Sequence, residues 1–185
     1  MDEMTLEELW ELFPILLTAH DPAWKTQFAQ EAALLCGALP AESIARIEHI
    51  GSTAVAGIWA KPTVDILVEL RPGAARDALF PALGRCGYGC MSQSGARASF
   101  QKGYTPQGFA EKVFHLHVRP FGDHDELYFR DYLCAHPEAA KAYEALKLSL
   151  WAPFRNDRDG YTAAKADFVR EYTARAKREF QNRYE

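Results

Sequence analysis

The sequence predicts an α+β fold, in which a core of strands and helices is followed by a helical C-terminal segment. Two pairs of strand-like runs lie within residues 43–70 and 96–121, and helical spacing of apolar residues surrounds them. After residue 123 the pattern is helical to near the C-terminus. We therefore expect one domain, residues 1–185, with an α/β core over about 1–122 and a helical segment packed on it over 123–185.

The composition places the chain among globular proteins. Its 185 residues are 48% hydrophobic and 25% charged, which is enough for one sizeable core. The net charge of −4 lacks the basic footprint of a nucleic-acid-binding protein, so we expect no nucleic-acid partner. No apolar run reaches 18 residues, so we expect no membrane association, and the acidic start "MDEMTLEELW" predicts a cytoplasmic protein without a signal peptide. The four cysteines form no C-x-x-C pair and are expected as reduced thiols.

Two helices are expected before the first strand. Thr5 and Glu8 form a capping box for a short helix over "LEELWELF". Asp21-Pro22 starts a second helix, because Asp caps and Pro fits the first turn, and Gly37 ends it.

The strands "SIARIEHI" (43–50) and "TVDILVEL" (63–70) follow, and Arg71-Pro72-Gly73 ends the second. A helix is expected around residues 74–84.

The runs "ARASFQKGY" and "EKVFHLHVRPF" predict two paired strands joined by the loop "TPQGFA" (105–110). The stretch 125–151 is helical with a boundary at His136-Pro137, because proline restricts the residue before it. Residues 159–180 are expected as one final amphipathic helix.

The Gly51-Ser52 pair follows directly after a predicted strand. Glycine permits a sharp turn and a close approach of the backbone to a ligand. Ser52 and Thr53 add hydroxyl groups, and a helix beginning here would favour a phosphate at its N-terminus. The alternative is an ordinary turn.

Asp65 is a single carboxylate within an apolar strand. An ionised Asp there is costly unless it is paired or bound to a cation. One alternative is that Asp65 ligates a metal. The other is a structural role, in which Asp65 accepts hydrogen bonds from the backbone of a loop or pairs with Lys61. Glu69 shares its strand face but lies roughly 13 Å away at about 3.3 Å per residue, so we expect it to be a surface charge at the strand end.

The H-x-H pair His115 and His117 points both imidazoles to one face of a strand. Two such histidines hold a divalent metal, donate to phosphate, or serve as half-buried sheet residues. His49 precedes the Gly-Ser turn and is expected to point at the same pocket. This gives Asp65, His117 and His115 as candidate catalytic residues and Asp65, His117 and His49 as candidate metal ligands.

The stretch "IEHIGSTAVAGIWAKPTVDILVEL" resembles the signature of the GrpB family, also called UPF0157. "FHLHV", "YFRDYLCAHPEAAKAYEALKLSL" and "YTAAKADFV" extend the resemblance over nearly the whole chain. The resemblance implies a nucleotidyltransferase-like fold of the polymerase-β type, a mixed sheet with packed helices and a cleft at the Gly-Ser loop. That superfamily pairs its G-[GS] turn with D-x-[DE] on the next strand. Here Asp65 fits the first carboxylate, and Leu67 replaces the second.

The resemblance implies transfer of a nucleotidyl or phosphoryl group from a nucleoside triphosphate to a small acceptor. The implied partner is a nucleotide or phosphorylated small molecule, and the implied cofactor is a divalent metal, Mg²⁺ or Mn²⁺, with Zn²⁺ suited to an Asp/His set. The residues expected to bind phosphate are Gly51, Ser52, Thr53, Lys61 and Arg130.

Several alternatives stay open. Leu67 favours a catalytically inactive nucleotide- or phosphate-binding module, and the histidines with Asp65 suggest a metal-dependent hydrolase. Arg130 either reaches a phosphate or forms a pair with its neighbour that fixes a helix to the sheet. Lys147 and Lys165 either line the cleft or form solvated helix faces. Tyr143 and Tyr161 are expected to be packing residues with a polar tip.

Overall fold

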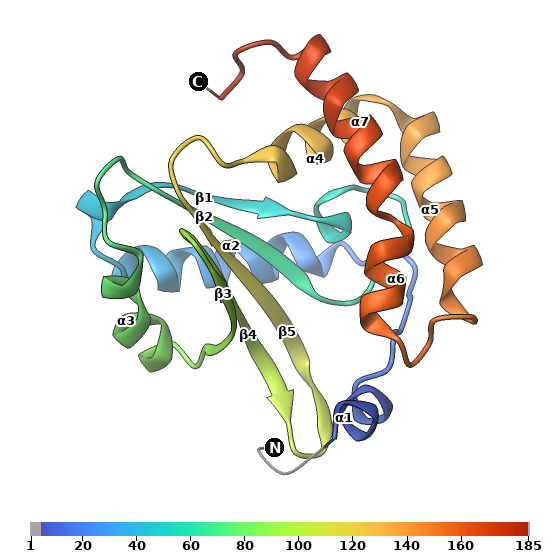
Figure 1. The fold of residues 1–185 in the computed structure, drawn as a ribbon, viewed down its shortest axis with the longest axis horizontal. Coiled ribbons are helices and arrows are strands. Elements are labelled where there is room, and N and C mark those ends of the chain that lie inside the picture. The colour runs from blue at the N-terminus through green and yellow to red at the C-terminus, as the bar shows by residue number, and fades with distance from the viewer. Residues whose placement is uncertain (1–4, 185) are drawn as a thin grey trace.

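The computed structural model describes residues 5–184 and contains a five-stranded sheet with the strand order β1-β2-β5-β4-β3 (Figure 1). The strands are β1 (Ile44–Ile50), β2 (Val64–Leu70), β3 (Gly89–Ser94), β4 (Arg97–Thr105) and β5 (Gly108–Arg119). The α-helices are α1 (Leu6–Leu12), α2 (Ala23–Ala38), α3 (Phe80–Arg85), α4 (Asp125–Ala135), α5 (Pro137–Trp151), α6 (Arg158–Ala164) and α7 (Ala166–Glu179). Within the described part of the chain, no helix combines the length and the apolar character that crossing a membrane requires.

The sheet is mixed. Strands β2 and β5 pair in parallel at its centre, whereas β1 with β2, β4 with β5 and β3 with β4 pair antiparallel. A parallel pair needs a long crossover, and here the chain between β2 and β5 contains α3, β3 and β4. The α+β class and the mixed sheet expected from the sequence are therefore confirmed.

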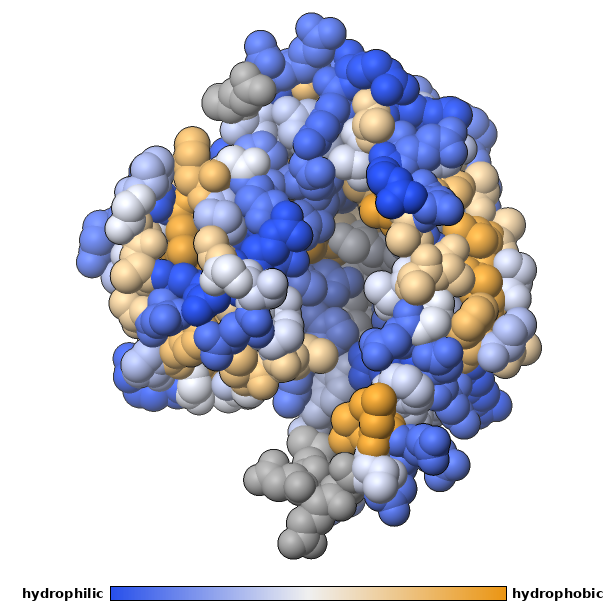
Figure 2. All heavy atoms as spheres, in the orientation of Figure 1, coloured by the Kyte–Doolittle hydropathy of each residue, from blue (hydrophilic) through white to orange (hydrophobic). Residues whose placement is uncertain are grey.

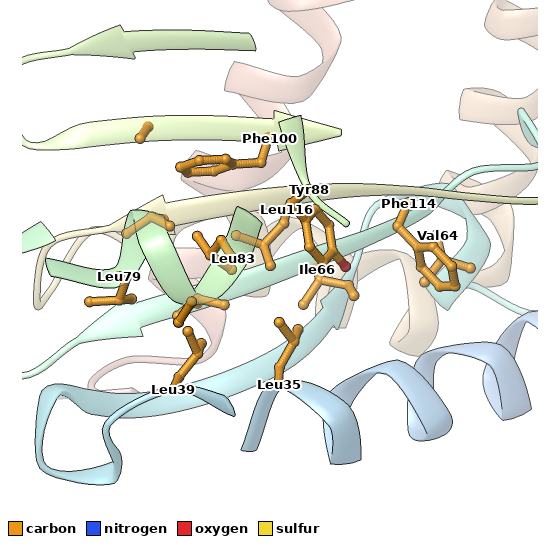
Figure 3. Packing of buried hydrophobic residues seen from close by; sticks show 14 of the residues in the cluster. Leu35, Leu39, Val64, Ile66, Leu79, Leu83, Tyr88, Phe100, Phe114 and Leu116 are labelled. Carbon is orange, nitrogen blue, oxygen red and sulfur yellow. The ribbon is translucent and has the colours of Figure 1, made fainter. Parts of the chain in front are cut away.

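One face of the sheet carries the main apolar core. Alternate residues of the central strands, such as Ile66 and Leu116, meet Leu35 of α2 and Leu83 of α3, and each of these side chains is fully buried (Figure 3). Because side chains alternate across a strand, the intervening residues of β2 and β5 point to the opposite face.

Helices from the C-terminal part of the chain cover that opposite face (Figure 1). Leu127 of α4 packs on Ile50 and Leu67, and a second cluster joins α4, α5 and α7 to Val55 and Ile58 of the loop before β2. The helical segment therefore lies over the face that carries Asp65.

The N-terminal cap and the break at proline agree with expectation. Thr5 and Glu8 form both hydrogen bonds of the capping box, and α5 begins at Pro137. The final helix differs, because Lys165 separates α6 from α7 where one continuous helix was expected.

The region around β4 corrects two expectations. Strands β4 and β5 extend to Thr105 and Gly108, so most of the predicted loop 105–110 is strand. Strand β3 was not predicted, since its sequence "GCMSQS" lacks apolar alternation, and it lies exposed at the sheet edge. An edge strand with one neighbour can be polar on both faces, which removes the pattern that identifies buried strands.

Glu69 is a further correction, because it is buried with 0% exposure rather than lying on the surface. Its carboxylate pairs with Arg46 Nε at 2.7 Å and His124 Nδ1 at 3.0 Å, and it accepts the Gly122 N–H at 2.7 Å. Glu69 therefore anchors the chain that leads from β5 into α4.

We predict that Glu69→Ala lowers the free energy of unfolding by about 3–5 kcal/mol, because it leaves the Arg46 guanidinium without its buried partner. Urea denaturation followed by circular dichroism measures this loss. Glu111→Ala, at an exposed position of β5, is the matched control and should change stability by less than about 0.5 kcal/mol. Equal effects of the two substitutions would contradict this structural role.

Candidate functional site

A cavity of about 790 Å³ lies between the Asp65 face of the sheet and helices α4 to α7. Figure 2 shows the molecule hollowed in this region, with hydrophilic residues on the left side of the hollow and more apolar residues on its right. Its lining includes Gly51, Ser52, Thr53, Lys61, Asp65, His115, His117, Phe129, Tyr143, Lys147, Tyr161 and Lys165. The structure thus gathers most of the predicted site residues on one cavity.

Asp65 faces both histidines of the H-x-H pair. It is the register partner of His115 across the parallel β2–β5 pair, and its Oδ1 lies 3.4 Å from His115 Nδ1 and 3.6 Å from His117 Nε2. Burial alone would raise the pKa of Asp65, but the hydrogen bonds that His115 and His117 donate to it lower that pKa well below its usual range. The carboxylate is therefore ionised at neutral pH.

Each imidazole is also held at its second nitrogen. His117 Nδ1 lies 3.3 Å from a nitrogen of Arg119, and since a guanidinium only donates, Nδ1 accepts and Nε2 carries the proton that faces Asp65. His115 Nε2 lies 2.9 Å from the Tyr104 hydroxyl, which accepts a hydrogen bond from Arg158. These contacts fix both rings around Asp65.

The donor set does not form a ready metal centre. Between residues 5 and 184, no three His, Cys, Asp or Glu side chains are grouped to hold a metal ion. The position of the expected second carboxylate is Leu67, with 0% exposure, and the proton on His117 Nε2 occupies the lone pair a metal needs. The residues thus do not fit a two-metal site. The binding of one divalent cation at this site stays a prediction.

Gly51 allows the loop to approach Asp65. Its φ is +72°, and a Cβ at this position would lie 2.4 Å from Asp65 Oδ2. Ser52 to Ala54 form only one short 3₁₀ turn, so the loop presents no extended helix N-terminus. Thr53 is buried, and its hydroxyl donates to the Thr63 carbonyl, whereas Ser52 lines the cavity.

His49 is not brought to this cluster. Its ring stacks on Phe28 of α2 at 4.9 Å between centroids, and its Nε2 lies 2.9 Å from Thr53 Oγ1. Burial lowers the pKa of His49 to about 4, so the ring is neutral. His49 supports the Gly-Ser loop from behind and does not line the cavity, which removes one ligand from the predicted metal set and from the hydrolase alternative.

Arg130 also lies outside the cavity. Its guanidinium donates to Asp131, to Glu48, to the His49 carbonyl and to the Tyr184 hydroxyl at 2.8–3.0 Å. The donors are committed to fixing α4 on β1, as the structural alternative for this residue predicts, and the expected contact with phosphate is not supported.

Three lysines converge on the cavity. Lys61 precedes β2, Lys147 lies on α5, and Lys165 lies between α6 and α7. Among the residues the structure describes, no carboxylate oxygen lies within 4 Å of their ammonium groups. The ammonium groups of Lys61 and Lys165 lie over the aromatic ring of Tyr161. Burial, reinforced by the charge of Lys61, lowers the pKa of both Lys147 and Lys165 to about 7.

The position of these lysines corrects the solvated-face alternative. Lys147 is only 2% exposed, and its Nζ donates to the Trp59 carbonyl. Sequence spacing could not reveal this, because the lysines come from three separate segments. Tyr143 and Tyr161 are buried, as expected, and the Tyr161 hydroxyl finds no hydrogen-bond partner among the described residues.

Comparisons with known proteins give consistent matches. A family model described as GrpB protein matches residues 14–175. A UPF0157 protein from Pseudomonas aeruginosa is 38% identical over 159 residues, which cover 84% of this chain and 65% of that protein. This chain therefore spans less than two thirds of that relative's length.

Two solved structures match the fold. The crystal structure of GrpB from Enterococcus faecalis has a TM-score of 0.77 at 30% identity and covers 89% of this chain and 99% of its own. The poly(U) polymerase Cid1 has a TM-score of 0.51 at 13% identity, over 80% of this chain and 46% of its own. The second match shows a nucleotidyltransferase-like fold alone.

We predict that Gly51→Ala destabilises the protein more than Gly57→Ala does. Both glycines have positive φ, and a Cβ at either costs about 1–2 kcal/mol of backbone strain, but nothing lies within 4 Å of the Gly57 position. The Cβ at residue 51 must also displace Asp65, which should add about 1–3 kcal/mol. Urea unfolding of both variants measures the difference, and equal losses would show that the Gly51–Asp65 contact is not tight.

Proposed function

This chain belongs to the GrpB family, and we propose that its cavity binds the phosphate groups of a nucleotide or a phosphorylated small molecule. The observation that carries the proposal is the convergence of Lys61, Lys147 and Lys165 on one cavity, with no ion pair to a carboxylate within residues 5–184.

The charge balance supports an anionic ligand. Lys61, Lys147 and Lys165 line the cavity together with the ionised Asp65. The two other carboxylates of the lining, Asp125 and Glu126, pair with Lys177 and Arg119. Buried charges of one sign are costly to hold together unless an opposite charge joins them. A phosphate chain supplies that charge, and the cavity volume suits a nucleotide-sized ligand.

Nucleotidyl transfer is the second candidate, favoured by Asp65, which is held ionised beside the Gly-Ser loop. In that reaction an acceptor hydroxyl forms a bond to phosphorus, the bond to pyrophosphate breaks, and the hydroxyl proton leaves to solvent. The lysines would stabilise the negative charge on the departing pyrophosphate. A divalent cation, Mg²⁺, Mn²⁺ or Zn²⁺, stays a prediction of this candidate, with Asp65 as its carboxylate ligand.

We predict that purified protein binds nucleoside triphosphates saturably in isothermal titration. The solved Cid1 structure that shares the fold is described with Mg 3′-dATP bound, so ATP, GTP, CTP and UTP are the first ligands to test. Lys61→Met, Lys147→Met and Lys165→Met should each weaken binding about tenfold or more, since each removes a charge-assisted contact worth about 1.5–3 kcal/mol.

Lys25→Met on α2 is the matched control and should leave affinity unchanged, because Lys25 is exposed and lies outside the cavity. Absence of saturable binding to every triphosphate and to pyrophosphate would refute the proposed function.

For the transfer candidate, we predict pyrophosphate release from a bound triphosphate when a panel of small hydroxyl acceptors is supplied. Asp65→Asn should abolish this release while retaining measurable triphosphate binding, because the lysines remain. A coupled pyrophosphate assay with and without divalent metal gives the readout. Binding without release under all conditions would favour the non-catalytic module.

A further inference from the structure

We infer that the negative charge of the bound phosphate is balanced by protons taken up at Lys147 and Lys165 rather than by a divalent cation. The inference rests on the proposed function and adds how that ligand is recognised. It follows from two features of the cavity: its poor set of metal ligands and its crowded ammonium groups.

The first feature is the shortage of anionic oxygen at the position of the superfamily's metals. Of the β2 residues on this face, only Asp65 offers a carboxylate to the cavity, because Leu67 is apolar and Glu69 is committed to Arg46 and His124. Asp125 and Glu126 of α4 also line the cavity, but they pair with Lys177 and Arg119. Mg²⁺ requires several oxygen ligands. The Nε2 proton of His117, fixed by Arg119 at the other nitrogen, further opposes metal binding.

The second feature is the environment of the two lysines. Lys147 is almost fully buried, Lys165 is half-buried, and both face Lys61 across the cavity. Burial and mutual repulsion hold their pKa near 7, so above neutral pH part of this charge is absent from the free protein. A bound phosphate reverses both effects, because it pairs with the ammonium form, and the pKa returns toward its ordinary value.

The neighbouring charged groups also act on these lysines. Glu144 attracts Lys147, Asp65 attracts Lys165 and Lys61, and Arg158 repels Lys61. Burial raises the pKa of Tyr143 to about 12 and also raises that of Tyr161, while burial lowers the pKa of His115. The cavity lining also contains the cations Arg97, Arg170 and Lys177 and the carboxylates Asp125 and Glu126. Because their pKa lies near 7, Lys147 and Lys165 are placed to take up protons between pH 7 and 9.

The test is isothermal titration of ATP into the full chain with EDTA present, at pH 8, in two buffers of different ionisation enthalpy. At this pH the terminal phosphate, with a second pKa of about 6, is ionised, so proton exchange reports the protein. We expect tight binding without metal and uptake of one to two protons per ATP. Affinity should fall by about tenfold per pH unit per proton as the pH rises from 7 to 9.

Substitutions assign the protons. Lys147→Arg and Lys165→Arg keep the positive charge permanently, because arginine is not deprotonated in proteins, so each should retain binding and reduce uptake by about one proton. Lys25→Arg should change neither quantity. These conservative variants avoid placing an apolar group in the cavity, and thermal unfolding confirms that they fold.

Two outcomes would overturn the inference while the proposed function stands. One is ATP binding with no proton exchange, and the other is binding that EDTA abolishes and Mg²⁺ restores. Failure of ATP, pyrophosphate and inorganic phosphate to bind under any condition would overturn both proposals together. Failure of the inference alone is therefore distinguished from failure of the proposed function by whether these ligands bind.

Discussion

The parallel pairing of β2 with β5 is the constraint on which the whole site depends. This register places Asp65 beside His115 and leaves Leu67 beside His117 on one face, while Ile66 and Leu116 fill the core on the other. A shift of one residue would exchange the two faces and bury the carboxylate in the apolar core. The energy that fixes the chemistry of the cavity is therefore the burial of apolar side chains behind it.

The cavity is assembled from both parts of the chain. The sheet supplies Asp65 and its two imidazoles, the loop before β2 supplies Ser52 and Lys61, and the helical segment supplies Lys147 and Lys165. Holding several like charges near each other opposes folding, so this arrangement makes the protein less stable than an apolar cavity would. Such a local conflict is typical of binding sites, where a ligand removes the unfavourable charge.

Charged residues outside the cavity hold these parts together. Arg130 ties α4 to β1, and Glu69 ties the end of β2 to Arg46 and His124. From the sequence, Arg130 is a plausible phosphate ligand and Glu69 a plausible surface charge. In the structure both residues instead hold segments together, because their side chains have partners from distant parts of the chain. The sequence pattern contains no information about those partners.

The sequence by itself determined the fold class, the Gly-Ser turn, the common face of His115 and His117, and the helix break at Pro137, since each depends on local spacing or backbone restriction. Tertiary structure decided that His49 stacks on Phe28, that β3 joins the sheet edge, and that Lys61, Lys147 and Lys165 share one cavity. The physical reason is that charge and burial are set by the neighbours that folding brings together, and these three lysines come from three separate segments of the chain but surround the same space.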